Sequence, residues 1–346
     1  MLPVIARLCG LHAQVMSSAE LTLWARVEGL EADAVVRALW EERSLVKTWA
    51  MRGTLHLLPA TEFPLWQAAL SSRRHYLRAS WSRYFGIIPE QLEQLLAAVA
   101  EALDGRLLTR KELADEVARL TGSAHLGEQV LSSWGALLKP AAFRGDLCFA
   151  PSSGQNVRFT RPASWLGRQD QVDAEQALAE VTRRFLSTYG PATREHFGRW
   201  WGLEPAPALA RIRALGEEVT EVEVDGGRAW TLVSNLPALA EAAPAGSVRL
   251  LPAFDQYVVC APRDSSVLPA AFRGRVYRPQ GWLSPVLLVD GRIEGVWQHE
   301  SKGSRIEVRI EPFQRVPAAI RRAAEVEAER LAAFLDGRAD VSWAGG

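Results

Sequence analysis

The feature that most constrains the fold is one pattern of predicted elements that occurs three times along the chain. Short helices at amphipathic spacing are followed by two strands around a tight turn, over residues 17–59, 90–161 and 174–233. The three stretches share this layout without obvious sequence identity. Helix, helix, helix, strand, turn, strand is the order of a winged helix, so we predict three such units in tandem. A repeated unit of this kind suggests a curved array that could surround a long ligand such as duplex DNA.

The pattern changes after residue 247. Strand-like runs separated by Pro and Gly occupy residues 247–313, and the Asp290-Gly291 pair predicts a tight hairpin turn. An amphipathic helix follows over residues 317–335, and we expect it to pack on these strands. This part of the chain predicts a small β-barrel or meander. The whole is therefore α+β and mainly helical.

The 346 residues divide into four predicted domains. They are a first winged helix with a basic linker (1–85), a second (86–170), a third (171–240), and the β-barrel with its C-terminal helix (241–346).

Composition removes several classes of protein. No stretch reaches ~18 uninterrupted apolar residues, so we expect no transmembrane helix, and the N-terminus lacks a basic n-region and a cleavage site. We expect a cytoplasmic, nucleoid-associated bacterial protein. The three cysteines lie more than a hundred residues apart, which disfavours both a disulfide framework and a structural zinc site. The motifs HExxH, GxxxxGK[ST] and GxGxxG do not occur.

The charges balance, with 40 basic and 40 acidic residues, but they are not evenly spread. Residues 67–84 contain four arginines and no acid, and residues 129–169 hold five basic residues against Asp146 alone. Two local basic stripes on a neutral protein fit either a DNA-facing surface or an arginine-rich surface without a function. The DNA-binding candidates from these stripes are Arg73, Arg74, Arg78, Arg83, Arg144 and Arg158.

Three motifs together carry a resemblance to a known family. They are VKTWAMRGTLHLLPA (46–60), LLPAFDQYVV (250–259) and PVLLVDGRIEGVW (285–297). In this order they resemble the winged-helix DNA glycosylases, the family that includes AlkZ and YcaQ, and the similarity covers nearly the whole chain. The resemblance implies a C-shaped scaffold around DNA. It also implies hydrolysis of the N-glycosidic bond of N7-alkylated guanines, bulky adducts and interstrand crosslinks included.

On this resemblance we expect a monofunctional, metal-independent DNA glycosylase without a cofactor. Its expected partner is double-stranded DNA carrying alkylated bases. We expect a monomer that does not bind membranes.

The catalytic motif of that family is polar–hydrophobic–polar, and His12-Ala13-Gln14 matches it with histidine where glutamine is commoner. On an extended chain residues 12 and 14 point to the same side. Gln14 could orient a water through its amide oxygen, and a neutral His12 could accept the proton of that water. The alternative is a helix-entry pair that satisfies backbone groups.

Further pocket candidates are Arg52, Thr54, His56 and Asp255. A continuous strand would place Arg52, Thr54 and His56 on one face, beside the motif. Alternatively, Arg52 and Gly53 form the turn of the wing and His56 belongs to the core. Asp255 could orient a group near the site or cap a strand end.

Two other classes of function compete with the enzyme: a non-catalytic winged-helix DNA-binding protein or transcriptional regulator, and a protein-interaction scaffold. A regulator would carry positive charge on each third helix for the major groove. The helix predicted over residues 31–46 carries four acidic residues against Arg37 and Arg43, which favours the enzyme.

Overall fold

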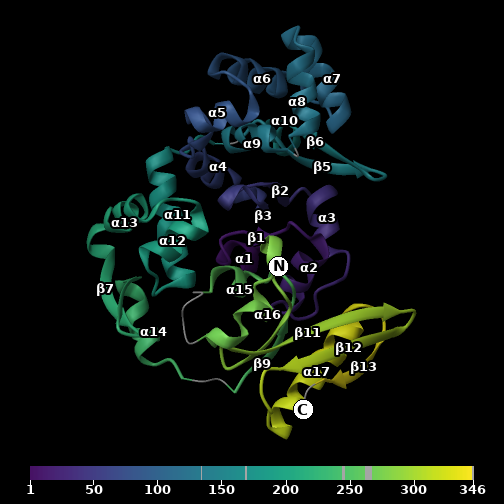
Figure 1. Cartoon of the computed structure of the whole chain (residues 1–346), viewed down its shortest axis with the longest axis vertical. Helices are drawn as coiled ribbons and strands as arrows, with labels where there is room; N and C mark the ends of the chain where they lie inside the picture. The colour runs from purple at the N-terminus through teal and green to yellow at the C-terminus, as the bar shows by residue number, and fades with distance from the viewer. Residues whose placement is uncertain (134, 168–169, 244–245, 262–266, 345–346) are drawn as a thin grey trace.

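The computed structural model describes residues 1–133, 135–167, 170–243, 246–261 and 267–344. In Figure 1 the N-terminal elements lie at the centre, with residues 89–160 above them, residues 174–240 to the left and the C-terminal sheet at the lower right. No helix in the described part of the chain is long and apolar enough to cross a membrane.

The first unit has the order helix, strand, helix, helix, strand, strand. Its elements are α1 (Leu2–Arg7), β1 (Leu11–His12), α2 (Met16–Trp24), α3 (Ala34–Trp40), β2 (Leu45–Trp49) and β3 (Leu55–Pro59). The three strands form an antiparallel sheet in the order β1-β3-β2. The short strand β1 is thus held against β3 and not against its nearer neighbour in the sequence.

The second unit repeats this sheet topology and this order, with one further short helix before its last two strands. Its elements are α6 (Pro89–Ala102), β4 (Leu108–Thr109), α7 (Arg110–Thr121), α8 (Ala124–Ser132), β5 (Cys148–Ser153) and β6 (Asn156–Thr160). The sheet order is β4-β6-β5. Thr109 accepts a hydrogen bond from the Glu112 amide and begins α7 with a capping box.

The third unit repeats the order again. Its elements are α11 (Ala174–Tyr189), α12 (Arg194–Trp201), α13 (Pro205–Arg213), β7 (Val219–Val224) and β8 (Gly227–Leu232). A single bridge between Ala192 and Trp230 takes the place of the first strand, so β8 is again flanked by the two other chain segments. The threefold repetition predicted from the sequence is therefore present in the elements.

Short helices connect the units and share one core. α4 (Phe63–Ser71) packs against α11 and against α9 (Lys139–Arg144), α5 (Ala79–Phe85) follows α4, and α10 (Pro162–Leu166) follows the second unit. One continuous cluster of buried side chains runs through all three units, from Cys9 to Leu232, and includes the fully buried Trp66 of α4. This shared core fixes the units against one another through contacts that α4 provides.

The predicted C-terminal barrel is not found in the described residues. The strands β9 (Val248–Leu251), β10 (Val286–Val289), β11 (Arg292–Lys302), β12 (Arg305–Pro312) and β13 (Arg338–Trp343) form an open sheet in the order β13-β12-β11-β10-β9. The expected Asp290-Gly291 hairpin joins β10 to β11, with positive φ at both residues.

Two segments that read as strands are helices, which is the physical reason for the open sheet. They are α15 (Gln256–Cys260) and α16 (Arg273–Val276). Both help to cover one face of the sheet, where Val258 and Val276 pack with Val286. The other face is covered by α17 (Ala318–Phe334) and by Leu21 and Trp24 of α2. A sheet covered on both faces buries its apolar side chains without closing into a barrel.

The four predicted domains have boundaries that fall between these elements, before residues 86, 171 and 241. The division into domains stays a prediction.

Candidate active site

The two polar residues of the motif lie at the end of β1. His12 pairs with His56 of β3, and the Ala13 amide donates to the Leu55 carbonyl at 2.8 Å. Strand pairing stops there, and Gln14 lies in the bend before α2 with its side chain exposed to solvent. His12 is by contrast only 7% exposed. The motif therefore presents one buried and one solvent-facing polar group.

His12 is enclosed by residues that are distant in the sequence. Its ring stacks on Phe254 with centroids 5.5 Å apart and planes at 20°, and meets His56 edge-on at 5.6 Å. The Gln256 side-chain oxygen accepts a hydrogen bond from the His12 amide at 3.4 Å. Trp282, 49% exposed, contacts Phe254 edge-on at 4.9 Å. Ring contacts thus connect the exposed Trp282 through Phe254 to the buried imidazole of His12.

The surroundings hold both histidines in their neutral form. Burial, and secondly the positive charge of Arg52, lower the pKa of His12 to about 4. Burial lowers the pKa of His56 well below its usual value, and His12 and Arg52 act in the same direction. At neutral pH each imidazole therefore offers one N–H donor and one nitrogen acceptor.

Two imidazole nitrogens are buried without a hydrogen-bond partner among the described residues. They are His12 Nδ1 and His56 Nε2. The other nitrogen of His56, Nδ1, lies 3.1 Å from the Thr54 carbonyl. A carbonyl only accepts, so a neutral His56 donates from Nδ1 and keeps Nε2 as an acceptor. Buried polar atoms of this kind are satisfied by ordered water or by a ligand.

Arg52 lies in the turn between β2 and β3. Of the two alternatives, Arg52 therefore belongs to a turn and not to a continuous strand. Met51–Gly53 form a tight turn, with Arg52 at φ 57° and Gly53 at φ 72°. The Thr54 hydroxyl donates to the Met51 carbonyl at 3.0 Å and closes this turn. His56 is fully buried, yet it borders His12. Arg52 is close enough to influence the pKa of both histidines.

Asp255 is fully buried and caps α15. Its carboxylate binds Arg26 of the segment after α2 through two bonds of 2.7 and 2.8 Å, and accepts from the Tyr257 amide at 2.8 Å. This pair ties the C-terminal part of the chain to the first unit directly behind Phe254. The carboxylate serves to orient its neighbours and begins a helix where a strand was expected.

Sequence reasoning missed Phe254, Gln256, Arg26 and Trp282. Phe254 adopts a positive φ of 56°, which is uncommon outside glycine and holds its ring against His12. The segment that contains Phe254 and Gln256 was singled out as a motif, but no pattern linked it to residue 12.

The predicted DNA-binding arginines lie in different settings. Arg74, Arg78 and Arg83 are exposed on and around α5. Arg144 is bound by both oxygens of Glu93, at 2.7 and 2.6 Å, and Arg158 donates to the Pro151 carbonyl at 2.6 Å.

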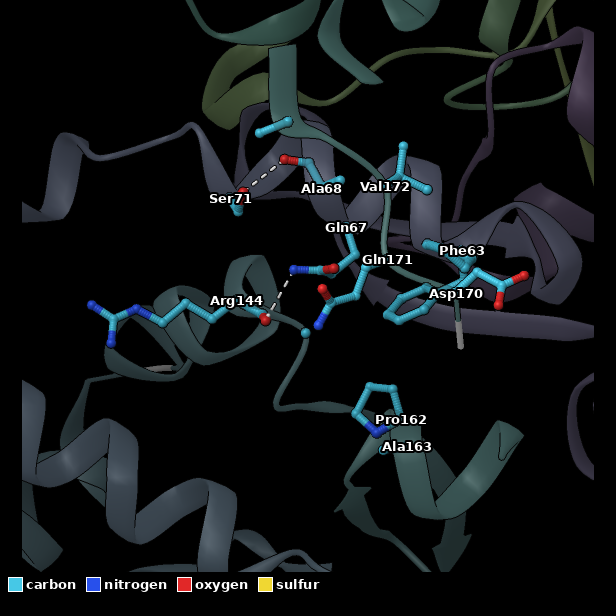
Figure 2. A pocket seen from close by; sticks show the side chains of 13 residues that line it. Phe63, Gln67, Ala68, Ser71, Arg144, Pro162, Ala163, Asp170, Gln171 and Val172 are labelled. Carbon is cyan, nitrogen blue, oxygen red and sulfur yellow. Dashed lines mark hydrogen bonds between the residues drawn. The ribbon is translucent and has the colours of Figure 1, made fainter. Parts of the chain in front are cut away.

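A cavity of about 640 Å³ lies between α4, α9 and α10 (Figure 2). The Gln67 amide donates to the Arg144 carbonyl at 3.0 Å across one side, and the Arg144 guanidinium points away from the other labelled side chains. Phe63 and Gln171 also line this cavity. Of the predicted site residues only Arg144 borders it, so it is separate from the His12 site.

The described residues contain no group of three or more His, Cys, Asp or Glu side chains that could hold a metal ion. At the site itself, the two imidazoles are accompanied by the cation Arg52 and by Asp255, which is already bound to Arg26.

Comparisons with known proteins agree along the whole chain. The model of the family described as DNA glycosylase AlkZ-like matches residues 5–334. An interstrand DNA cross-link repair glycosylase of Streptomyces sahachiroi is 38% identical over 338 residues, which is 95% of this chain and 89% of that protein. The solved structure of Streptomyces sahachiroi DNA glycosylase AlkZ superposes with a TM-score of 0.89, covering 99% of this chain and 92% of that one. The chain belongs to the AlkZ-like family of DNA glycosylases.

Proposed function

We propose that this protein is a monofunctional glycosylase that hydrolyses the N-glycosidic bond of cationic N7-alkylguanines in duplex DNA, interstrand crosslinks included. The observation that carries the proposal is the pair of buried imidazole nitrogens, His12 Nδ1 and His56 Nε2, beside an exposed Gln14. Neutral acceptors next to a solvent-facing amide are suited to hold a water at the sugar. The crosslink substrate rests on the similarity to the interstrand DNA cross-link repair glycosylase of Streptomyces sahachiroi.

The leaving group needs little help in this reaction. An N7-alkylguanine carries a positive charge on its imidazole ring, and the electron pair of the C1′–N9 bond neutralises that charge when the bond breaks. The sugar is left with oxocarbenium character at C1′. Water adds to C1′, one of its protons passes to an acceptor, and an abasic site results. No metal and no strong general acid is required by this sequence of steps.

His12 and Gln14 together position the attacking water and accept its proton. The Gln14 amide oxygen orients the water, and the neutral His12 ring accepts a hydrogen bond from it. A pKa of about 4 makes His12 a weak base, so it takes up the water proton late, when attack on C1′ has made that water acidic. Positioning and charge stabilisation then supply most of the rate.

The three repeated units act as winged helices in a C-shaped scaffold around the duplex. Each has the sheet order expected of that motif, with the first strand beside the third. The exposed Arg74, Arg78 and Arg83 would contact phosphates, a role that needs no base reading. The protein acts as a monomer in this proposal.

The charges on α3 favour the enzyme over a regulator. Arg37 of α3 is bound to Glu31 and to Asp33, the latter at 2.7 Å. An arginine already paired with two carboxylates is poorly placed to bind guanine in a major groove.

The test is to incubate the protein with duplex DNA that contains one N7-methylguanine, and separately with a nitrogen-mustard crosslink. We expect abasic sites and free N7-methylguanine from the first, and separated strands from the second after cleavage at abasic sites. Specific binding of both duplexes without release of a base would favour the non-catalytic DNA-binding protein.

A further inference from the structure

A group of positive charges collects where the three units meet. Lys139 begins α9 in the second unit and lies against the turn between β2 and β3, since a Cβ on Gly53 would be 3.3 Å from its Cδ and 3.5 Å from its Nζ. Arg73 follows α4 and reaches the third unit, where its guanidinium donates to the Trp201 carbonyl at 2.7 Å. Arg52 lies in the same turn as Gly53.

Two of these cations, Arg73 and Lys139, have no carboxylate partner among the described residues. The guanidinium of Arg73 contacts two uncharged groups, the Trp201 carbonyl and the ring of Phe143, 5.1 Å away. In the part of the chain that the structure describes, no carboxylate forms an ion pair with Arg73 or Lys139. By contrast, nearby Arg144 has Glu93, and Arg184 has Glu62 at 2.8 Å.

The cations also repel one another. Burial, and then the charge of Arg52, lower the pKa of Arg73 to about 10. Burial, and then the charge of Arg73, lower the pKa of Lys139. Half-buried like charges destabilise the folded state until an anion joins them. This arrangement therefore lowers the stability of the free protein, and a bound anion would offset the repulsion.

Beside Arg73 there is room for such an anion. A cavity of about 340 Å³ is lined by Ser72, Arg73, Arg74, His75 and Arg78 on one side and by Gly202 on the other. Gly202 has φ 90°, and a Cβ at this position would lie 2.8 Å from Arg73 Nη2. The absence of a side chain at residue 202 thus leaves room for the guanidinium against the third unit.

We propose that Arg73 and this cavity form a binding site for one phosphate group, supplied by the DNA backbone next to the lesion. Lys139 does not line the cavity and adds its positive charge to the attraction from α9. Arg73 contributes to the lowered pKa of His56, which places the site within electrostatic reach of the active-site imidazoles. A phosphate held here would fix the register of the damaged strand relative to His12. The choice of DNA as the source of the phosphate rests on the proposed function.

The experiment measures binding with one backbone phosphate at a time replaced by a neutral methylphosphonate. The duplex carries a 2′-fluoro N7-methylguanosine, which resists cleavage, so binding is measured without excision. Wild type is compared with Lys139→Gln and with the matched control Lys111→Gln. Lys111 is an exposed lysine of the same unit, bound to Asp115 at 2.7 Å. The melting temperature of each variant is measured in parallel.

For wild type and Lys111→Gln we expect a loss of affinity of about tenfold at one or two phosphates beside the lesion, as for one charge-assisted contact. Lys139→Gln should bind the unmodified duplex about tenfold more weakly and should lose its sensitivity at those same positions. Its melting temperature should equal or exceed that of wild type, because a repulsive charge is removed. If methylphosphonate replacement lowers the affinity equally at every position in all three proteins, the proposal is wrong.

Inorganic phosphate, added at constant ionic strength, separates the two sources of the anion. Inorganic phosphate could raise the melting temperature of wild type but not of Lys139→Gln, while methylphosphonate replacement has the same effect on the affinity of both proteins. In that case the site binds free phosphate, and the assignment to the DNA backbone is wrong. Excision is measured separately on cleavable N7-methylguanine. Position-specific binding without excision would contradict the glycosylase proposal alone, and excision without position-specific binding would contradict the phosphate site alone.

Discussion

The lowered pKa of His12 should be visible in the pH dependence of excision. An imidazole with the pKa of about 4 expected for His12 is about one-tenth protonated at pH 5, whereas one with an ordinary pKa near 6.5 is about 97% protonated. If the neutral ring is the active form, excision at pH 5 keeps about nine-tenths of its rate at pH 7. With an ordinary histidine the rate at pH 5 would be about 25-fold lower than at pH 7. Half of the maximal rate is then expected near pH 4.

The assay is single-turnover release of N7-methylguanine from a duplex between pH 3.5 and 8, corrected for spontaneous depurination and accompanied by circular dichroism. His12→Gln restores the commoner motif, and its profile should have no acid limb. Arg52→Gln should move the limb to higher pH, because a positive charge near His12 is lost, while burial still holds the pKa of His12 below 6.5.

Three results would refute this reasoning. A loss of about 25-fold in wild type between pH 7 and 5 would mean that His12 has an ordinary histidine pKa. A rate that rises on acidification would mean that the charged ring is the active form. Identical profiles for wild type and His12→Gln down to pH 3.5 would mean that protonation of His12 does not affect the reaction.

Further predictions concern stability, binding and reactivity. The folded-state pKa of His12 lies below the unfolded value of 6.5, so its stabilising contribution is complete above pH 6.5 and declines as the pH falls. By pH 4 the free energy of unfolding should have decreased by about 3 kcal/mol on account of His12. Urea midpoints measured against pH should therefore decline less steeply for His12→Gln. Asp255→Asn should lower the free energy of unfolding by about 3 kcal/mol, because it leaves the partly buried Arg26 without its carboxylate, and an unchanged midpoint would contradict this. Changing Arg74 and Arg78 to Ala should weaken binding to all duplexes alike and reduce the salt slope by about 2, whereas a loss confined to one base sequence would count against phosphate contacts. Burial raises the pKa of Cys9 to about 12, so iodoacetamide at pH 8 should label it only after denaturation, as mass spectrometry can determine.

Local signals in the sequence predicted the elements that depend on local chemistry. Asp290-Gly291 make the expected tight hairpin between β10 and β11, because this motif acts over two residues. The same holds for the threefold order of helices and strands, which follows from amphipathic spacing and turn residues.

Elements that depend on distant partners were not predicted correctly. The apolar run after Asp255 reads as a strand, yet Asp255 caps it as a helix and is itself held by Arg26, 229 residues away. Strand β13 was missed, since it follows a long helix and pairs in parallel with β12. These outcomes are decided by tertiary contacts that no local pattern contains.

The candidate site likewise combines a local motif with distant contacts. The family motif identified His12 and Gln14, but the stacking of Phe254 on His12 joins residues 242 positions apart, and the pKa of His12 depends on that enclosure. Sequence alone therefore indicated which residues to examine, and the structure supplied the environment that keeps the imidazole neutral.

The central claim is that a water held by His12 and Gln14 attacks the sugar of an N7-alkylguanine nucleotide. The most direct measurement compares wild type with Gln14→Ala for single-turnover excision of N7-methylguanine and for binding of the non-cleavable duplex. Gln14 is exposed and adds little contact area, so we expect excision to fall about 10²- to 10³-fold while the dissociation constant stays within a few-fold. Excision and binding that fall together, or excision that is unaffected, would contradict the account.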